Sequence, residues 1–256
     1  MPDLSAVQLD AYLEGLLEVQ GMADYCPNGL QVEGRPIIKK IVAGVSANQA
    51  LIDVAVAHQA DALLVHHGFF FKGEPSCVRG VFYKRLSALI KHDINLFAYH
   101  LPLDTHPIYG NNAQLAQALG CEQVSQFTLF NTKNLGWLGE FSEPVSLKAL
   151  KEQLATILLQ VPKHFGDAID DHMVKKLAWC TGAAQDGIHE AFLQGADVFI
   201  SGEVSERTVA LAKEYPIEYL CCGHHATERS GVRALGAHIE AKFNIECVFV
   251  DVPNDV

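Results

Sequence analysis

Metal-competent side chains follow three strand-like segments of this 256-residue sequence, at the point where each segment ends. They are His66, His67, His100, Asp104, His224 and Glu228. In open parallel sheets, ligands bind beyond the carboxyl ends of the strands, so these residues are where a binding site is expected. Imidazole and carboxylate groups together suit zinc, iron or manganese. The sequence therefore predicts a metal site at these strand ends.

Two of the pairs have the spacing H-x-x-x-acid. His224 and Glu228 are four residues apart where a helix is expected to begin, which puts both on one helix face. His100 and Asp104 have the same spacing, although Pro102 argues against a regular helix there. A site with two metal ions needs at least one bridging carboxylate, and Asp104 and Glu228 are the candidates.

The adjacent His66 and His67 raise a question of geometry, because neighbouring side chains on a strand point to opposite faces. One histidine is incidental, or the strand ends at Gly68 and both are used. A single histidine after a strand more often has a structural hydrogen-bonding role. Six such residues at three strand ends favour metal binding, and with two metals the neighbours need not bind the same ion. The Phe69–Phe71 triplet has two interpretations. Together with Lys72 it lines a substrate pocket, or its phenylalanines belong to the core or an interface.

The elements that position these residues alternate between strands and helices. Helical spacing is found at 5–19, 48–59, 81–92, 111–119, 146–159, 186–194, 206–214 and from about 226. Strand-like runs are found at 37–45, 62–65, 94–99, 177–181, 198–201, 217–222 and 245–252. This alternation is typical of βαβ units and predicts an α/β fold with mostly parallel sheets.

The two halves of the sequence resemble each other. When residues 39–67 are aligned with 175–203 without a gap, eight of the 29 positions are identical, including Ala60-Asp61 against Ala196-Asp197. The window ends with His66-His67 opposite Gly202-Glu203, and further on the two H-x-x-x-acid segments correspond. The alignment favours an internal duplication, which would make the halves related lobes whose strand ends could converge on one cleft.

The composition excludes several classes of protein. The formal net charge is −11 and no Lys/Arg-rich run occurs, which argues against a nucleic-acid-binding surface. The seven cysteines include no C-x-x-C pair, so neither a zinc ribbon nor a thioredoxin-type motif is present. We see no signal peptide and no apolar run of the roughly 18–20 residues that a membrane span needs. We therefore expect a cytoplasmic protein.

Four stretches of the sequence resemble the Nif-three-like family, whose members are often named GTP cyclohydrolase 1 type 2 homologues. They are DYCPNGLQVEG (24–34), LLVHHGFFFKGE (63–74), HLPLDTHPIYGNN (100–112) and CCGHHATER (221–229). The resemblance covers essentially the full chain in order. It implies a two-lobed α/β subunit with a dinuclear metal centre in the cleft between the lobes. We expect residues 1–125 with 220–256 to form the lobe that carries the metal ligands and 126–219 to form the other.

The resemblance also implies the ligand set. His66 and His67 match paired histidines that each serve a different metal. Asp104 matches the aspartate of the H-x-x-x-D segment. His224 and Glu228 match a C-terminal pair in which the glutamate bridges two divalent ions. The resemblance further implies assembly into a toroidal homohexamer with the sites facing an internal cavity.

Other positions follow or depart from the family pattern. His100 matches a histidine beside the centre, with an outer-shell or proton-transfer role, and His225 is not among the expected ligands. Many relatives have Thr where this chain has Leu101, which alters a hydrogen bond near the site. The span between Gly120 and Lys175 is too short for the extra regulatory insert of longer relatives, so the chain resembles the compact bacterial form.

The leading functional hypothesis is a dinuclear metal-dependent hydrolase acting on a small molecule, with hydrolytic opening of the guanine ring of GTP as the reaction that the resemblance implies. His100 is the candidate general base or acid. Glu203 is a weaker candidate for the cleft wall. The sequence has no Gly-rich phosphate loop, so a triphosphate would depend on the metals and on Lys72, Arg79 or Arg229.

The alternative hypothesis is a non-catalytic protein that binds or handles metal and regulates partners or delivers metal to them. Family members have been tied to protein-interaction roles, which supports this alternative. A nucleic-acid-binding factor is disfavoured by the acidic charge.

Overall fold

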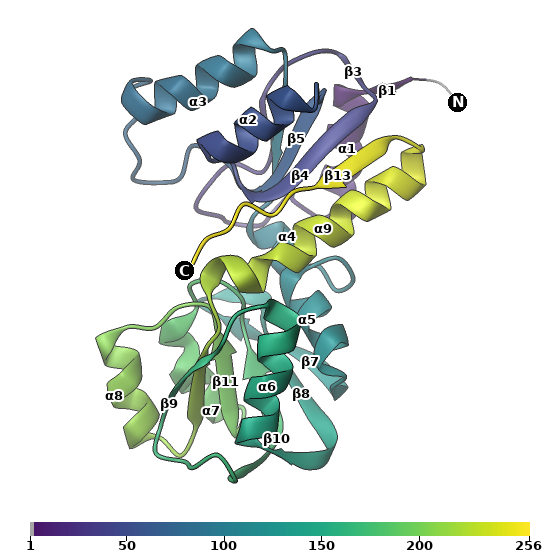
Figure 1. The fold of residues 1–256 in the computed structure, drawn as a ribbon. Coiled ribbons are helices and arrows are strands. Elements are labelled where there is room, and N and C mark those ends of the chain that lie inside the picture. The colour runs from purple at the N-terminus through teal and green to yellow at the C-terminus, as the bar shows by residue number, and fades with distance from the viewer. Residues whose placement is uncertain (1–2) are drawn as a thin grey trace. The chain divides into compact units, whose positions relative to one another are not determined.

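A computed structural model describes residues 3–256 (Figure 1). Contacts within the chain divide it into two compact units. Unit 1 contains the described residues up to Gly110 together with Gly231–Pro253, and unit 2 contains Asn111–Ser230 with Asn254–Val256. Each unit has a large sheet of its own.

Unit 1 is built on a five-stranded sheet in the order β13-β4-β5-β6-β2. Its strands are β2 (Gly29–Val32), β4 (Lys40–Ser46), β5 (Ala62–His67), β6 (Asn95–Ala98) and β13 (Glu246–Phe249). All neighbours are parallel except β2, which pairs antiparallel with β6. A separate antiparallel pair joins β1 (Leu4–Ser5) to β3 (Ile37–Ile38). The helices are α1 (Ala6–Leu16), α2 (Gln49–Ala57), α3 (Gly80–Lys91), α4 (Leu101–Thr105) and most of α9 (His224–Phe243).

The two faces of this sheet bury different sets of side chains. Along β5, Ala62 and Leu64 join the core formed with α1 and α9, whereas Leu63 and Val65 join the core formed with α2 and α3. The alternation follows from the two-residue period of a strand. Burial on both faces explains why these strands are continuous apolar runs rather than alternating ones.

Unit 2 has a six-stranded sheet in the order β7-β8-β10-β11-β12-β9. Its strands are β7 (Glu122–Leu129), β8 (Thr132–Ser146), β9 (Lys163–Phe165), β10 (Met173–Trp179), β11 (Val198–Ser201) and β12 (Glu218–Cys221). Strands β10, β11 and β12 are parallel; β8 and β9 join them antiparallel, and β7 pairs antiparallel with β8. The helices are α5 (Asn111–Leu119), α6 (Leu147–Leu158), the 3₁₀ turn η1 (Gln185–Gly187), α7 (Ile188–Leu193) and α8 (Glu206–Glu214), with the first residues of α9.

The predicted internal repeat is visible in the hydrogen bonds of each unit. In unit 1, Asp61 Oδ2 accepts from the backbone N–H groups of Lys39 and Lys40 at 2.7 and 3.0 Å. In unit 2, the aligned Asp197 Oδ2 accepts from Lys175 and Lys176, both at 2.8 Å. Each aspartate precedes the second strand of a parallel strand–helix–strand connection and fixes the start of the first. The sequence identity at these positions therefore has the same structural cause in both halves.

The structure confirms the α/β class, with parallel strands at the centre of both sheets. The predicted helices and strands are present with ends that shift by a few residues, while β1, β2, β9, α4 and the β7–β8 hairpin were not predicted. The contacts divide the chain elsewhere than near residues 125 and 220. Helix α5 and the start of α9 belong to unit 2, because Leu115 and Ala226 are buried in its core. Among the described residues, no helix combines the length and apolar character that crossing a membrane requires.

Candidate metal centre

His66 is the most deeply placed of the predicted ligands. Its side chain is fully buried at the end of β5, and its Nδ1 lies 2.9 Å from the backbone carbonyl oxygen of Tyr99. A carbonyl oxygen only accepts, so Nδ1 carries the proton and donates. The other ring nitrogen, Nε2, lies 3.5 Å from Asp104 Oδ2 in a buried setting. A lone pair that faces a carboxylate needs a cation close by, either a proton or a metal ion.

His67 follows on the same strand, and β5 extends through both histidines and ends at His67, directly before Gly68. The two rings nevertheless approach each other, with centroids 4.6 Å apart. His67 Nδ1 lies 3.0 Å from the hydroxyl of Ser46, its cross-strand partner at the end of β4. Because β5 ends here, the His66 and His67 rings can extend beyond the end of the sheet and approach each other, although they start on opposite faces. Adjacency on a strand therefore does not prevent a shared role.

His100 is held by a carboxylate that the sequence analysis did not single out. Asp24 Oδ1 lies 2.7 Å from His100 Nδ1. The same carboxylate accepts from the backbone N–H of Leu101 at 3.0 Å and from the amide of Asn28 at 2.8 Å. Burial raises the pKa of Asp24, but the hydrogen bond and charge of His100, together with hydrogen bonds from Asn28 and the backbone of Tyr25, outweigh burial and lower the pKa overall. The arrangement fixes the His100 ring with Nε2 on its outer side.

Three imidazoles of unit 1 therefore converge. One ligand atom from each of His66, His67 and His100 lies within 4.8 Å of the others. In each ring Nδ1 is engaged by an oxygen, which leaves Nε2 as the nitrogen presented to a ligand. Metal-binding histidines in proteins usually have their second nitrogen fixed in this way. The donor set of unit 1, with Asp104 beside it, fits a divalent transition metal.

Asp104 reaches this position through a short helix that the sequence analysis doubted. Pro102 lies in the first turn of α4, where its missing N–H has no intrahelical partner to lose. The N–H groups of Leu103 and Asp104 both donate to the carbonyl of His100, at 2.9 and 3.1 Å. The expectation that Pro102 would prevent a regular helix is therefore wrong for this turn.

Unit 2 contributes a second group of donors. His224 and Glu228 lie in the first turns of α9, and His224 Nε2 is 3.1 Å from Glu228 Oε2. His224 Nδ1 is 2.7 Å from Glu203 Oε1, so Glu203 has the same relation to His224 that Asp24 has to His100. Burial lowers the pKa of His224, but the two carboxylates outweigh it and raise the pKa to about 9. Glu228 itself is only 2% exposed.

Gly182 is a further residue that the sequence analysis missed. It follows β10 with φ of +71°, and a Cβ at this position would lie 2.2 Å from Glu228 Oε1 and 3.4 Å from His224 Nε2. The backbone therefore passes so close to the candidate ligands that only glycine fits at this position. Gly182 aligns with Ser46 in the internal repeat, and both lie at a strand end beside a candidate ligand.

Several of the remaining histidines have structural partners and lie outside the candidate site. Four examples are His106, His164, His189 and His238, which bond to backbone N–H groups, a glutamate or tyrosine hydroxyls. The predicted set therefore draws one cluster of donors from unit 1 and another from unit 2. Each cluster combines imidazole with at least one buried carboxylate.

The fold and the two donor clusters define an α/β protein with metal-competent strand ends. The family model for Duf34/NIF3 (NGG1p interacting factor 3) matches residues 5–255, so the chain belongs to this family. Proteins named GTP cyclohydrolase 1 type 2 homolog are similar along nearly their whole length. The one from Yersinia pestis is 47% identical over 248 residues, covering 97% of this chain and 98% of the relative. The one from Vibrio cholerae is 45% identical over 254 residues, covering 99% and 100%.

Solved structures also resemble the chain along nearly its whole length. A structure described as protein ybgI, of unknown function, has a TM-score of 0.93 at 42% identity and covers 99% of this chain and 100% of its own. The protein TTHA1606 from Thermus thermophilus has a TM-score of 0.86 at 32% identity, covering 99% and 100%. Reduced HcgD from Methanocaldococcus jannaschii has a TM-score of 0.83 at 25% identity, covering 98% and 99%. The predicted family resemblance is confirmed.

Proposed function

We propose that this chain is a metal-dependent hydrolase with a dinuclear centre. The observation that carries the proposal is the shared geometry of four histidines, three in unit 1 and His224 in unit 2, whose Nδ1 atoms are all held by oxygens. His66, His67 and Asp104 from unit 1, with His224 and Glu228 from unit 2, would together hold two divalent cations such as zinc, iron or manganese. Ions of this kind, when bound, lower the pKa of a coordinated water and polarise the bond to be cleaved.

His100 has the setting of a general base or acid in this proposal. Its pairing with the Asp24 carboxylate keeps the proton on Nδ1 and leaves Nε2 able to accept one. Its side chain is 15% exposed, so a substrate can reach the ring. The rings of Phe71 and Tyr25 lie edge-on to it, with centroids 5.5 and 6.4 Å away, and restrict its movement. Asp24 thus positions the group that moves the proton.

The proposed substrate is a nucleotide, with GTP as the first candidate. Curated relatives at 45–47% identity carry the name GTP cyclohydrolase 1 type 2 homolog, which supports hydrolytic opening of the guanine imidazole ring. We also propose, from the family resemblance, that the protein works in the cytoplasm as a toroidal homohexamer. Light scattering on the purified protein would measure the mass of the assembly directly.

The decisive experiment compares turnover with metal content. Purified protein loaded in turn with zinc, iron or manganese is offered GTP, other nucleotides and phosphoesters. We expect hydrolysis that His100→Ala abolishes while metal content stays normal, and that Glu228→Ala abolishes together with metal binding. His58→Ala, an exposed histidine at the end of α2, is the matched control. Turnover that survives in both site variants would refute the assignment.

The second candidate function is non-catalytic metal handling or regulation through partners. The family description, NGG1p interacting factor 3, favours it because it names an interaction rather than a reaction. In this case the same variants would lose metal, and no substrate of the panel would turn over. Metal transfer to a competing chelator, followed by absorbance, would then be the informative assay.

A further inference from the structure

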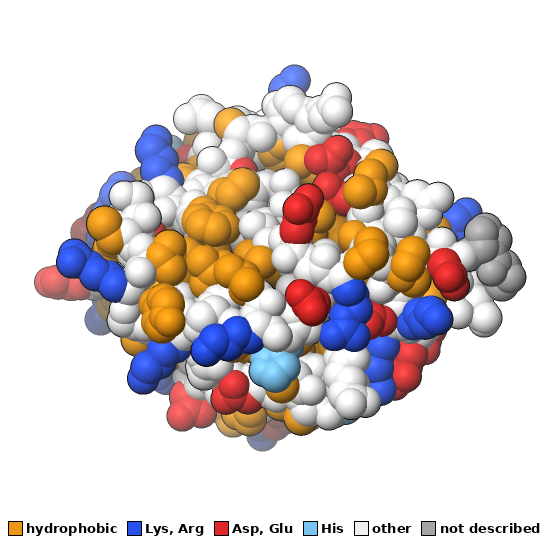
Figure 2. Space-filling view, turned by 90° about the horizontal axis from the view of Figure 1, so that it is seen from above, with side chains coloured by type: hydrophobic (Ala, Val, Ile, Leu, Met, Phe, Trp, Pro, Cys, Tyr) orange, Lys and Arg blue, Asp and Glu red, His pale blue; other side chains and the backbone are white. Residues whose placement is uncertain are grey.

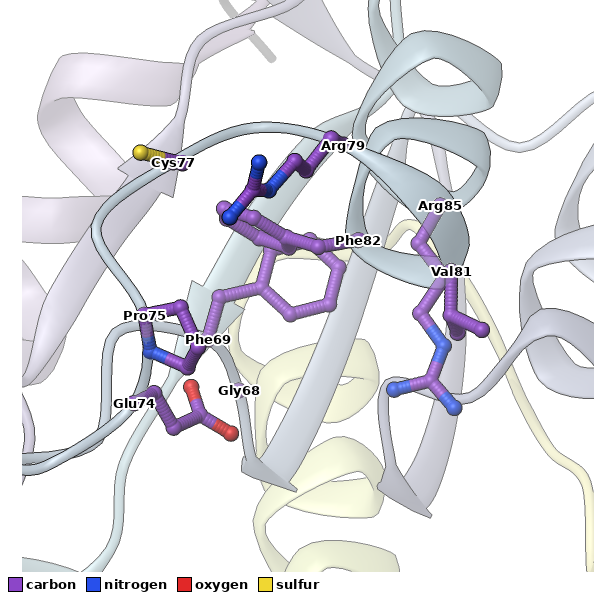
Figure 3. A pocket seen from close by; sticks show the side chains of 9 residues that line it. All are labelled: Gly68, Phe69, Glu74, Pro75, Cys77, Arg79, Val81, Phe82 and Arg85. Atoms are coloured by element: carbon purple, nitrogen blue, oxygen red, sulfur yellow. The ribbon is translucent and has the colours of Figure 1, made fainter.

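A pocket of about 410 Å³ lies in unit 1 beside the histidine pair. Its wall begins with Gly68 and Phe69, the two residues that directly follow His67, and continues along the loop before α3 and the first turns of that helix. The volume is within the range of about 300–1,000 Å³ that small-molecule sites occupy. Figure 3 shows the side chains that line it. The pocket is separate from the donors described above.

Two arginines line this pocket, and neither has an anionic partner. Within residues 3–256, Arg79 and Arg85 form no ion pair, and Arg85 Nε is buried with no hydrogen-bond acceptor. Figure 3 shows the two guanidinium groups with phenylalanine rings between them in this view. A buried guanidinium nitrogen without an acceptor is costly, so an acceptor supplied by a ligand would be favourable. In a chain of formal net charge −11, two unpaired arginines at one pocket are a distinctive feature.

Glu74 is the one carboxylate among the lining residues, and it is already engaged. Its Oε2 accepts from the backbone N–H of Phe71 at 3.2 Å, which holds the turn after the phenylalanine triplet. The pocket lining therefore carries two cationic groups against one anionic group. The local charge is opposite to that of the whole chain, and it favours an anion.

The floor of the pocket is aromatic. Phe69 is 3% exposed and packs edge-on against Phe82, with ring centroids 5.3 Å apart. Two exposed apolar side chains adjoin this floor, because Phe70 packs edge-on against Phe82 and Val81 lines the pocket. Figure 2, seen from above, shows hydrophobic side chains gathered on one face with Lys and Arg around them. Flat apolar surface beside guanidinium groups suits a ligand with a planar ring and phosphates.

The pocket is rigidly tied to the histidine pair. Gln31 accepts from the N–H of Phe69 at 2.7 Å and donates to the Phe69 carbonyl at 3.2 Å. A Cβ on Gly68 would lie 2.3 Å from Gln31 Oε1, so the chain passes Gln31 in close contact. A ligand held by Phe69 would therefore have a fixed position relative to His67.

We propose that this pocket binds the phosphate-bearing part of a nucleotide, with Arg79 and Arg85 on the phosphates and the phenylalanine floor against the planar portion. The inference rests on the proposed function for the idea that the bound nucleotide is the substrate. It names Arg79 and Arg85 together as the anion site, whereas the sequence alone left Lys72, Arg79 and Arg229 open. Arg229 has a different role, because its guanidinium donates to the carbonyl of Leu158.

The test measures binding without relying on turnover. Chelator-treated protein is titrated calorimetrically with GTP, inorganic triphosphate and guanosine at fixed ionic strength. We expect GTP and triphosphate to bind, guanosine to bind much more weakly, and Arg79→Ala or Arg85→Ala to weaken triphosphate about tenfold to a hundredfold. Arg207→Ala, on the exposed face of α8 in unit 2, is the matched control and should bind as the unsubstituted protein does.

A thiol on the pocket wall gives a second readout. Cys77 is exposed and lines the pocket, so bound GTP should slow its alkylation, and Cys77→Ser identifies that signal. Unchanged triphosphate binding in both arginine variants, or an unchanged alkylation rate, would overturn the inference even if the protein hydrolyses GTP. Arginine-dependent binding without turnover on any substrate would instead uphold the pocket and refute the proposed function.

Discussion

Replacing Gly182 by alanine places a methyl group against the candidate ligands of unit 2. The new Cβ would lie 2.2 Å from Glu228 Oε1, whereas ordinary contact begins at 3.4 Å. The buried carboxylate must therefore withdraw by about 1.2 Å, or the backbone must move by a similar amount. Displacing a well-packed buried group costs about 1–3 kcal/mol. A misplaced ligand should also weaken metal binding by about 10- to 100-fold, as the loss of a supporting contact does.

Gly195 provides a control with the same backbone strain and no steric conflict. Its φ is +72°, against +71° for Gly182, and the one atom within 4 Å of its Cβ is the Lys176 Nζ at 3.8 Å. Alanine in the left-handed conformation costs about 1–2 kcal/mol at either position. The difference between the two variants therefore isolates the contact with Glu228.

The assay combines urea denaturation of the metal-free proteins with metal titration of the folded ones. We expect Gly182→Ala to lose about 1–3 kcal/mol more stability than Gly195→Ala, and to be the one variant with impaired metal binding. Equal losses of stability with full metal binding in both variants would show that the Gly182 backbone does not constrain a ligand. It would remove Glu228 from the proposed ligand set.

Three further predictions follow from other contacts. Asp24→Asn should lower turnover about 10²- to 10⁴-fold with unchanged metal content, because it removes the carboxylate that fixes the proton on His100 Nδ1; steady-state kinetics beside metal analysis would detect it. Asp61→Ala and Asp197→Ala should each lower the unfolding free energy by about 1–3 kcal/mol, as measured by urea unfolding. The loss should be larger for Asp61→Ala, because Asp61 also pairs with the guanidinium of Arg35. Burial lowers the pKa of His238, so its contribution to stability is complete above about pH 6.5 and is lost as the pH falls towards the folded-state pKa. His238→Gln should therefore flatten the fall of the melting temperature below about pH 6.5, and an unchanged slope would contradict the assignment.

The spacing of apolar residues predicted the helices and central strands, because the buried positions of each element form a pattern within its own short stretch of sequence. The run from Ala62 to Val65 alternates between two cores, and this alternation requires apolar side chains at every position. The β7–β8 hairpin escaped prediction because much of it is exposed and polar, with no apolar run to mark it. Pattern analysis detects strands that are buried on both faces and misses those that depend on pairing alone.

The candidate ligands were predictable, but of their supports only Glu203 had been singled out, as a candidate for the cleft wall. His66, His67 and His100 stand directly at strand ends, which the chain order reveals. Asp24 supports His100 from 76 residues away, and no spacing rule connects them. Gly182 could not be predicted either, because only the three-dimensional structure shows that a side chain there would clash with Glu228. A residue that acts through a long-range contact leaves no periodic signal in the sequence.

The repeat suggests how one scaffold came to hold two kinds of donor. Asp61 and Asp197 perform the same task in both halves, so the strand–helix–strand frame is common to them. At the aligned strand ends the residues differ, with His67 in unit 1 and Glu203 in unit 2. Unit 1 thus offers mainly imidazole, and unit 2 offers one imidazole between two carboxylates. Bridging two cations needs carboxylate, whereas binding each one separately is served by imidazole. If the halves arose by duplication, the changes at these strand ends gave the two units different donor sets, as the proposed dinuclear centre would need.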